Sequence, residues 1–142
     1  MIRIRSATAA DQDIIRHIVR IGELPPYSLR WQQFLVAEQD GRVIGVGQIR
    51  RHGRYNELGS LAVLPEYRGQ GVGAQLIAAL EAQAGLPLYL FCQEPVETYY
   101  RRFGYHRIRF LEAPGPLKPL ALIGFTLPRL FGVRIRLMRK DG

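Results

Sequence analysis

AVLPEYRGQGVGAQL (residues 62–76) places three glycines within five positions, Gly69, Gly71 and Gly73. An apolar run typical of a strand precedes them, and a pattern rich in alanine and leucine, typical of a helix, follows. Glycine in a helix costs about 1 kcal/mol relative to alanine. Three glycines at one helix start therefore indicate that the backbone there has a function that side chains would obstruct.

The task that fits this stretch is anion binding. The first amides of a helix lack intrahelical acceptors and carry partial positive charge. Without a Cβ, glycine lets an anion approach those amides closely, and the loop can adopt positive φ. Arg68, at the head of the run, would add a charge-assisted contact to the same anion. The alternative is a glycine-rich loop that binds no ligand.

Two familiar nucleotide motifs fit the stretch poorly. A P-loop needs Lys and a hydroxyl residue at the helix start, and Gly71-Val72-Gly73 supplies neither. A dinucleotide fingerprint needs G-x-G-x-x-G and an acidic residue that closes the next strand. Here the spacing is G-x-G-x-G, and LYLFCQ (88–93) ends without that acid.

Length and composition predict one globular domain over 1–142. The 142 residues, 47% of them hydrophobic, suffice for one core. The longest uncharged apolar stretch, 119–128, is far shorter than the ~20 residues that span a bilayer, so we expect no membrane span. A lone cysteine, Cys92, fits a reducing compartment, and we expect a cytoplasmic protein.

The net charge of +8 lies in the last third of the chain. Residues 98–142 contain ten Arg and Lys residues against two acidic residues, whereas 1–97 are neutral. A basic block of this kind is typical of binding to nucleic acid, a membrane surface or an anionic ligand, or is simply a solvated face. Arginine predominates, which favours planar, bidentate contacts with anions.

Hydrophobic periodicity predicts a mixed α/β fold, and we see no repeats or linker. A capping-box spacing at 8–11 should start a helix that ends near Gly22. Strands are expected at 2–5, 34–39, 43–50, 56–64, 86–92, 105–111 and 133–139, and further helices at 28–31, 71–84 and 96–103. Residues 113–132, rich in Pro, Gly and Leu, are expected to be irregular.

Two blocks together resemble the GNAT N-acetyltransferase superfamily. The first, Leu61-Ala62-Val63-x-Pro65-x-Tyr67-Arg68-Gly69-x-Gly71-x-Gly73, is similar to its acyl-CoA signature. The second, Tyr99-Tyr100-Arg101-Arg102-Phe103-Gly104-Tyr105, resembles its later helix-turn-strand motif. The resemblance implies a mostly antiparallel, twisted sheet of six to seven strands flanked by about four helices.

It further implies acetyl-CoA as co-substrate. The amides from Arg68 through Gly73, with Gln70 and Val72 between the glycines, would bind the pyrophosphate. The backbones of Ala62 and Val63, with Leu61 before them, would pair with the pantetheine arm, whose amides match the free groups of a strand end.

Two catalytic residues follow from the same resemblance. Acetyl transfer to an amine needs a base, a proton donor for the thiolate and donors for the carbonyl oxygen. Glu57 lies where many family members carry the base; otherwise it is an exposed strand residue or a partner for Arg54. Tyr100 matches the tyrosine near the thioester sulfur; otherwise it is a core aromatic. Members of the family often have Asn at the position of Gln93, so the resemblance implies no role for the Gln93 side chain.

The other chemically active residues fit structural roles better. Cys92 could form an acyl-enzyme, but a buried thiol is usually a small hydrophobe. His17, His52 and His106 show no metal-ligand spacing, so no metal is expected. His52 could line the acceptor side, but a surface turn residue is the simpler interpretation.

We therefore expect an acetyl-CoA-dependent N-acetyltransferase that acts by direct transfer to a small-molecule or peptide amine. Two alternatives are a module that binds nucleic acid or an anionic surface, and a non-catalytic acyl-CoA-binding relative. Few aromatics interleave with the arginines, which disfavours nucleic acid. If those arginines face the site, the acceptor is a small acidic amine such as an amino acid. Residues 113–132 would shape specificity or form a homodimer contact.

Overall fold

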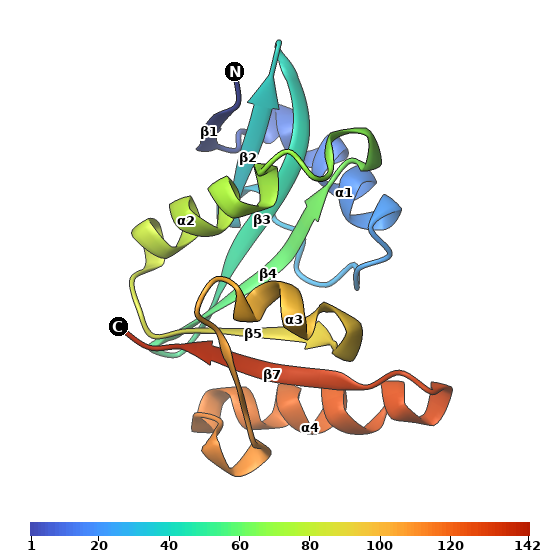
Figure 1. Cartoon of the computed structure of the whole chain (residues 1–142), viewed down its shortest axis with the longest axis vertical. Coiled ribbons are helices and arrows are strands. Elements are labelled where there is room, and N and C mark those ends of the chain that lie inside the picture. The colour runs from blue at the N-terminus through green and yellow to red at the C-terminus, as the bar shows by residue number, and fades with distance from the viewer. The chain divides into compact units, whose positions relative to one another are not determined.

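A computed structural model describes all 142 residues, and the chain divides into two compact units. The first comprises Met1–Arg50 and Leu58–Ala84, and the second comprises Arg51–Glu57 and Gly85–Gly142. The chain contains seven strands and four α-helices (Figure 1). This is the mixed α/β class that the sequence predicts.

The first unit contains β1 (Arg3–Ser6), β2 (Phe34–Gln39) and most of β3 (Arg42–His52) and β4 (Tyr55–Val63), which are neighbours in the order β1-β2-β3-β4. The hairpin end of β3 and β4, within Arg51–Glu57, belongs to the second unit. β1 pairs with β2, and β2 with β3, both antiparallel. The two-residue turn between β2 and β3 has positive φ at Asp40 and Gly41, 53° and 76°. This is the tight hairpin that Asp-Gly predicts.

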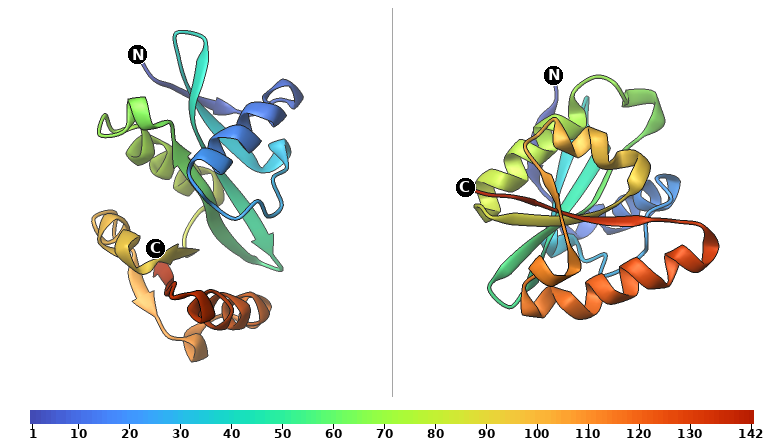
Figure 2. Two further views of the ribbon diagram at one scale, coloured as in Figure 1. Left: turned by 90° about the vertical axis from the view of Figure 1, so that its right-hand side faces the viewer. Right: turned by 60° about the horizontal axis from the view of Figure 1, so that its bottom comes forward.

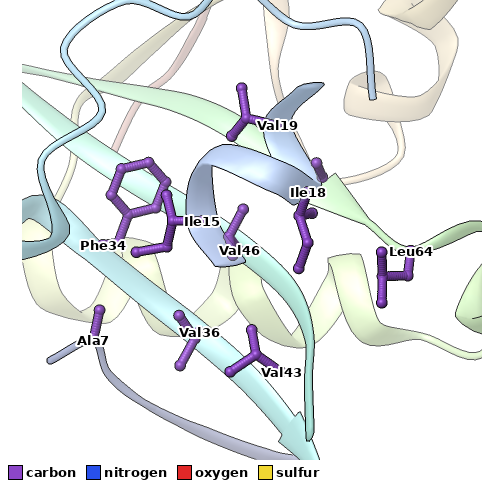
Figure 3. Packing of buried hydrophobic residues seen from close by; sticks show 10 residues of the cluster. Ala7, Ile15, Ile18, Val19, Phe34, Val36, Val43, Val46 and Leu64 are labelled. Atoms are coloured by element: carbon purple, nitrogen blue, oxygen red, sulfur yellow. The ribbon is translucent and has the colours of Figure 1, made fainter. Parts of the chain in front are cut away.

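α1 (Gln12–Ile21) packs on one face of these strands. Its apolar stripe buries Ile15, Ile18 and Val19 against side chains of β2 and β3, as Figure 3 shows. The predicted capping box precedes the helix: the Thr8 amide donates to the Asp11 carboxylate at 2.7 Å. The expected helix at 28–31 is only a 3-10 turn, Trp31–Gln33.

α2 (Val72–Ala84) contacts β1 and β2 and lies against two glycines of β3. A Cβ built on Gly45 would lie 3.0 Å from the Val72 side chain, and one on Gly47 would lie 2.8 Å from that of Leu80. The helix therefore approaches this strand to a distance that no larger residue would allow.

In the second unit the strand order is β5-β7-β6, with β5 (Leu88–Gln93), β6 (His106–Ile108) and β7 (Ile135–Lys140). Both neighbours of β7 are antiparallel to it. α3 (Glu97–Arg101) precedes β6, and both views in Figure 2 show α4 (Lys118–Thr126) beside β7.

Two expectations for this unit were wrong in detail. The strand predicted at 105–111 ends at Ile108, because Arg109 begins a 3-10 turn whose amide donates to Glu112 at 2.9 Å. The excursion at 113–132 contains helix α4, followed by a turn over Pro128–Phe131. Ala121 and Leu117 pack with Leu137 of β7 in the core of this unit.

Candidate active site

The glycine loop of the first unit has the conformation that the sequence predicts. Gly69 and Gly71 have φ of +78° and +81°, and no heavy atom lies within 4 Å of a Cβ built on either. α2 begins at Val72, and its first hydrogen bond runs from the Gln75 amide to the Gly71 carbonyl at 3.1 Å. The amides before Gln75 therefore have no acceptor within the helix, and the space beside the glycines can admit an anion.

The end of β4 supplies the other predicted cofactor residues. Ala62 is buried and lies 3.3 Å from a Cβ built on Gly22, at the end of α1. Arg68 folds back onto the strand, where its Nε donates to the Val63 carbonyl at 3.0 Å. The guanidinium is thus tied to the strand end, and its contact with an anion stays a prediction.

Glu57 lies in the second unit, at the hairpin where β3 gives way to β4. Only 3% of the residue is exposed, so it is not the exposed strand glutamate of the alternative interpretation. Its Oε1 lies 2.7 Å from Nε2 of His52 across the turn. Arg54, the other suggested partner, lies over the Tyr55 ring, 5.4 Å from its centroid.

The contact between Glu57 and His52 is the site feature that sequence reasoning missed. His52 was expected to be a surface turn residue, but its side chain is only 14% exposed. The signal in the sequence was Gly53 between two strand patterns, and in the structure its φ of +62° closes a tight turn there. Such a turn brings residues on either side of it into cross-strand contact.

Tyr100, from α3, is buried in an aromatic cluster of the second unit. Its ring makes edge-to-face contacts with Tyr99 and Tyr105, at centroid distances of 5.3 and 6.1 Å. Burial, with smaller contributions from Cys92 and Tyr99, raises the pKa of the Tyr100 hydroxyl above its usual value. The phenol is therefore protonated at neutral pH, which both of its predicted roles require.

Cys92, the penultimate residue of β5, is buried beside Met138, with 3.7 Å between the sulfurs. Burial and the nearby Glu97 carboxylate raise the pKa of the thiol to about 11. A thiolate is the nucleophilic form of cysteine. The environment therefore favours the structural role over an acyl-enzyme.

A basic pocket of about 400 Å³ lies in the second unit. Five arginines line it together with Phe110 and Phe125: Arg107, Arg109, Arg129, Arg134 and Arg136.

Three of the five have acidic partners in the chain. Arg109 pairs with Glu112 at 3.2 Å, and both Arg134 and Arg136 pair with Glu94. Arg107 and Arg129 form no ion pair within 4.0 Å, although Arg107 acts at longer range on the Glu97 carboxylate and helps to lower its pKa. The pocket thus has positive charge to spare for an anion of modest size.

No cluster of three His, Cys, Asp or Glu side chains is arranged to hold a metal ion. No helix is both long enough and apolar enough to span a membrane.

Comparison with protein families gives one match. The family model described as an acetyltransferase (GNAT) domain matches residues 30–107, more than half of the chain. The chain therefore belongs to the GNAT acetyltransferase family. No curated protein sequence matched the chain.

Solved structures share the fold at low sequence identity. N-acetylglutamate synthase from Neisseria gonorrhoeae, solved with coenzyme A and N-acetyl-glutamate, is 19% identical with a TM-score of 0.82 over 99% of this chain. The chain spans only 35% of that protein. Rv2747 from Mycobacterium tuberculosis, solved with CoA and NLQ, is 20% identical, with a TM-score of 0.77 over 99% of both chains. ElaA from Escherichia coli is 15% identical, with a TM-score of 0.70 over 99% of this chain and all of that one.

Proposed function

We propose that the chain transfers the acetyl group of acetyl-CoA directly to a primary amine bound in the same complex. The observation that carries the proposal is the open, positive-φ glycine loop at the start of α2. The amides from Arg68 through Gly73 would bind the CoA pyrophosphate, and the backbone of Leu61, Ala62 and Val63 would pair with pantetheine. Acetyl-CoA supplies the activated thioester.

Glu57 is the proposed base. An amine must lose a proton before it attacks the thioester, and a buried carboxylate can take that proton. The near-complete burial of Glu57 is compatible with the role, because it separates the carboxylate from bulk water. Tyr100 would give a proton to the departing thiolate: its phenol is protonated at neutral pH, although the burial that raises its pKa makes it a weaker acid.

The proposed acceptor is a small amine that carries a carboxylate, such as an amino acid. The five arginines of the basic pocket support this, because guanidinium groups bind carboxylates bidentately. The Neisseria structure contains N-acetyl-glutamate, an acetylated amino acid of the same chemical class. A polycationic amine would be repelled by the same charges.

Cofactor binding can be tested without an acceptor. A chain that binds acetyl-CoA is stabilised by RT ln(1 + [L]/Kd), about 2.7 kcal/mol when the ligand is at 100 times Kd. We expect acetyl-CoA to raise the melting temperature. An unchanged melting temperature at saturating acetyl-CoA would contradict the proposal.

Catalysis is tested by two substitutions with matched controls. Glu57→Gln and Tyr100→Phe should each lower kcat roughly 100-fold or more, the usual contribution of an acid or base, and leave acetyl-CoA binding intact. Glu66→Gln and Tyr99→Phe should have little effect, since Glu66 is exposed and Tyr99 only packs beside Tyr100. Full activity of both test variants would remove these assignments, and an inactive wild-type chain that binds acetyl-CoA would identify a non-catalytic relative.

We further propose a homodimer and a cytoplasmic location. α4 and the turn after it expose large apolar side chains, 55% to 80% accessible: Leu122, Ile123, Leu127, Leu130 and Phe131. A second copy would cover such a face, and light scattering of the purified chain measures the mass directly. The buried, reduced Cys92 supports the location.

A further inference from the structure

We propose that His52 is the proton exit of the site: it takes the proton from Glu57 after each transfer and passes it to water. The inference rests on the proposed function, in which Glu57 is the base. It adds a residue that neither the glycine loop nor the family motifs include, and it explains why a partly exposed imidazole contacts a buried carboxylate.

Transfer of the acetyl group to a protonated amine releases one proton in each cycle. A protonated primary amine carries three N–H protons, whereas the amide product keeps one and the CoA thiol takes another. In the transfer the C–S bond of the thioester breaks and a C–N bond forms. The third proton must therefore leave the protein in every cycle, or Glu57 would stay protonated and could not act again.

Glu57 is poorly placed to release that proton itself. Its side chain is 4% exposed, whereas that of His52 is 14% exposed. Between them lies one contact of 2.7 Å, from Oε1 to Nε2. This distance is within the range for direct proton transfer between a base and its hydrogen-bonded partner.

Imidazole can accept a proton on one ring nitrogen and release one from the other. The O–H bond of protonated Glu57 breaks as an N–H bond forms on His52, which leaves a carboxylate beside an imidazolium. The imidazolium then loses its Nδ1 proton to water, and proton exchange with water returns the neutral ring to the tautomer whose Nε2 can accept again. No oxidant, metal or further group is needed.

The arginines of the surrounding hairpin cannot take the proton in place of His52. Both are directed elsewhere: Arg51 donates to the Gly53 carbonyl at 2.8 Å, and Arg54 lies over Tyr55. A guanidinium does not give up or accept protons at neutral pH. Tyr55 stacks edge to face on Tyr89, with 6.0 Å between centroids, which fixes the hairpin in the second unit.

His52→Gln tests the relay in the full chain, with acetyl-CoA and L-glutamate as substrates. Glutamine can still donate a hydrogen bond to the carboxylate but cannot carry a proton. We expect kcat to fall about 100-fold, the lower end of the range for acid–base groups, with the KM for acetyl-CoA unchanged. Added imidazole should restore kcat in the variant and leave the wild-type rate unchanged.

The matched control is His106→Gln. His106 also faces a carboxylate, Asp141, but at 3.7 Å and with both side chains about half exposed. This variant should keep the wild-type rate and show no response to imidazole. A melting curve of His52→Gln close to that of the wild type separates the relay from a folding defect.

Several outcomes would overturn the inference. A wild-type kcat in His52→Gln does so, as does a loss that imidazole fails to restore. Glu57→Gln separates this failure from that of the proposed function. If Glu57→Gln is inactive and His52→Gln is not, only the relay falls. If Glu57→Gln is fully active, or the wild-type chain acetylates no free amino acid, the proposed function itself is wrong.

Discussion

At the scale of single residues, the second unit protects its one thiol. Cys92 lies in an apolar site beside Met138, and its pKa of about 11 leaves little thiolate at neutral pH. We therefore predict that Cys92→Ala keeps kcat within a few-fold of the wild type and that maleimide labels the native thiol far more slowly than the unfolded one. The labelling rate can be followed by mass spectrometry. An acetylated Cys92 trapped during turnover would contradict direct transfer.

Asp11 provides a prediction on stability. The hydrogen bond from Arg5, at 2.8 Å, lowers the pKa of the Asp11 carboxyl below its ordinary value of 3.8. A carboxyl whose pKa is lower in the folded than in the unfolded state stabilises the fold above the unfolded pKa. That contribution is lost as the pH falls below about 4, and it is gone once the pH is below the folded pKa.

Asp11→Asn should therefore lose about 1 kcal/mol at pH 7, as expected for a lost helix cap. The difference from the wild type should shrink as the pH falls below 4. Urea unfolding across this range measures it, and Asp13→Asn, an exposed neighbour, is the control. A difference that does not change with pH would show that the charge of Asp11 is not involved.

At the scale of elements, substitutions of glycine can distinguish an effect on acetyl-CoA affinity from an effect on stability. Gly71→Ala places a Cβ at φ +81° in open space, so it strains the backbone by roughly 1–2 kcal/mol and obstructs the approach of an anion. Gly41→Ala has the same positive φ, +76°, and the same open surroundings in the β2–β3 turn. We predict similar losses of stability in both variants, and a weaker affinity for acetyl-CoA in Gly71→Ala alone. Calorimetric titration measures the affinity, and an equal loss in both would argue against a site at the loop.

Many of the strands and helices could be predicted from local patterns in the sequence. Alternation predicts β2 and β3, and the glycine run together with the apolar stripe predicts α2 with its start within one residue. α4 was missed because Pro119 and Gly124 read as loop residues. Proline is tolerated in the first turn of a helix, where its missing amide would have no acceptor.

The contacts of the candidate site are harder to foresee than the elements. The pair of Glu57 and His52 depends on the geometry of a turn, and the pocket arginines come from β6 and the residue after it, the turn after α4, and β7 and the residue before it. Charge composition shows that these arginines exist, but only tertiary packing brings them into one pocket. The family motifs could suggest Glu57 and Tyr100, since each lies at a fixed distance from a recognisable block.

At the scale of the whole molecule, the positive charge is concentrated near one pocket. Arg107 is the cation to test because it lines the pocket and has no ion-pair partner within 4.0 Å, although it interacts with the Glu97 carboxylate at longer range. Arg107→Gln should raise the KM for L-glutamate about tenfold and leave the KM for acetyl-CoA unchanged, and Arg30→Gln in the first unit should change neither. In the wild type, added salt should raise the KM for L-glutamate, because ions screen exposed charges. A salt-independent KM and an unaffected variant would exclude this pocket as the acceptor site.

Gly45 and Gly47 of β3, which pack against α2, link substitutions in the core to the position of the glycine loop. A methyl group on Gly45 would meet Val72, the first residue of the helix, before it met any ligand. A substitution at Gly45 could therefore displace the start of α2 and the loop before it. The proposed affinity for acetyl-CoA would then change although no loop residue has been replaced. If the loop binds CoA as proposed, the affinity also depends on this packing, and a selection for tighter binding could yield substitutions in β3 as well as in the loop.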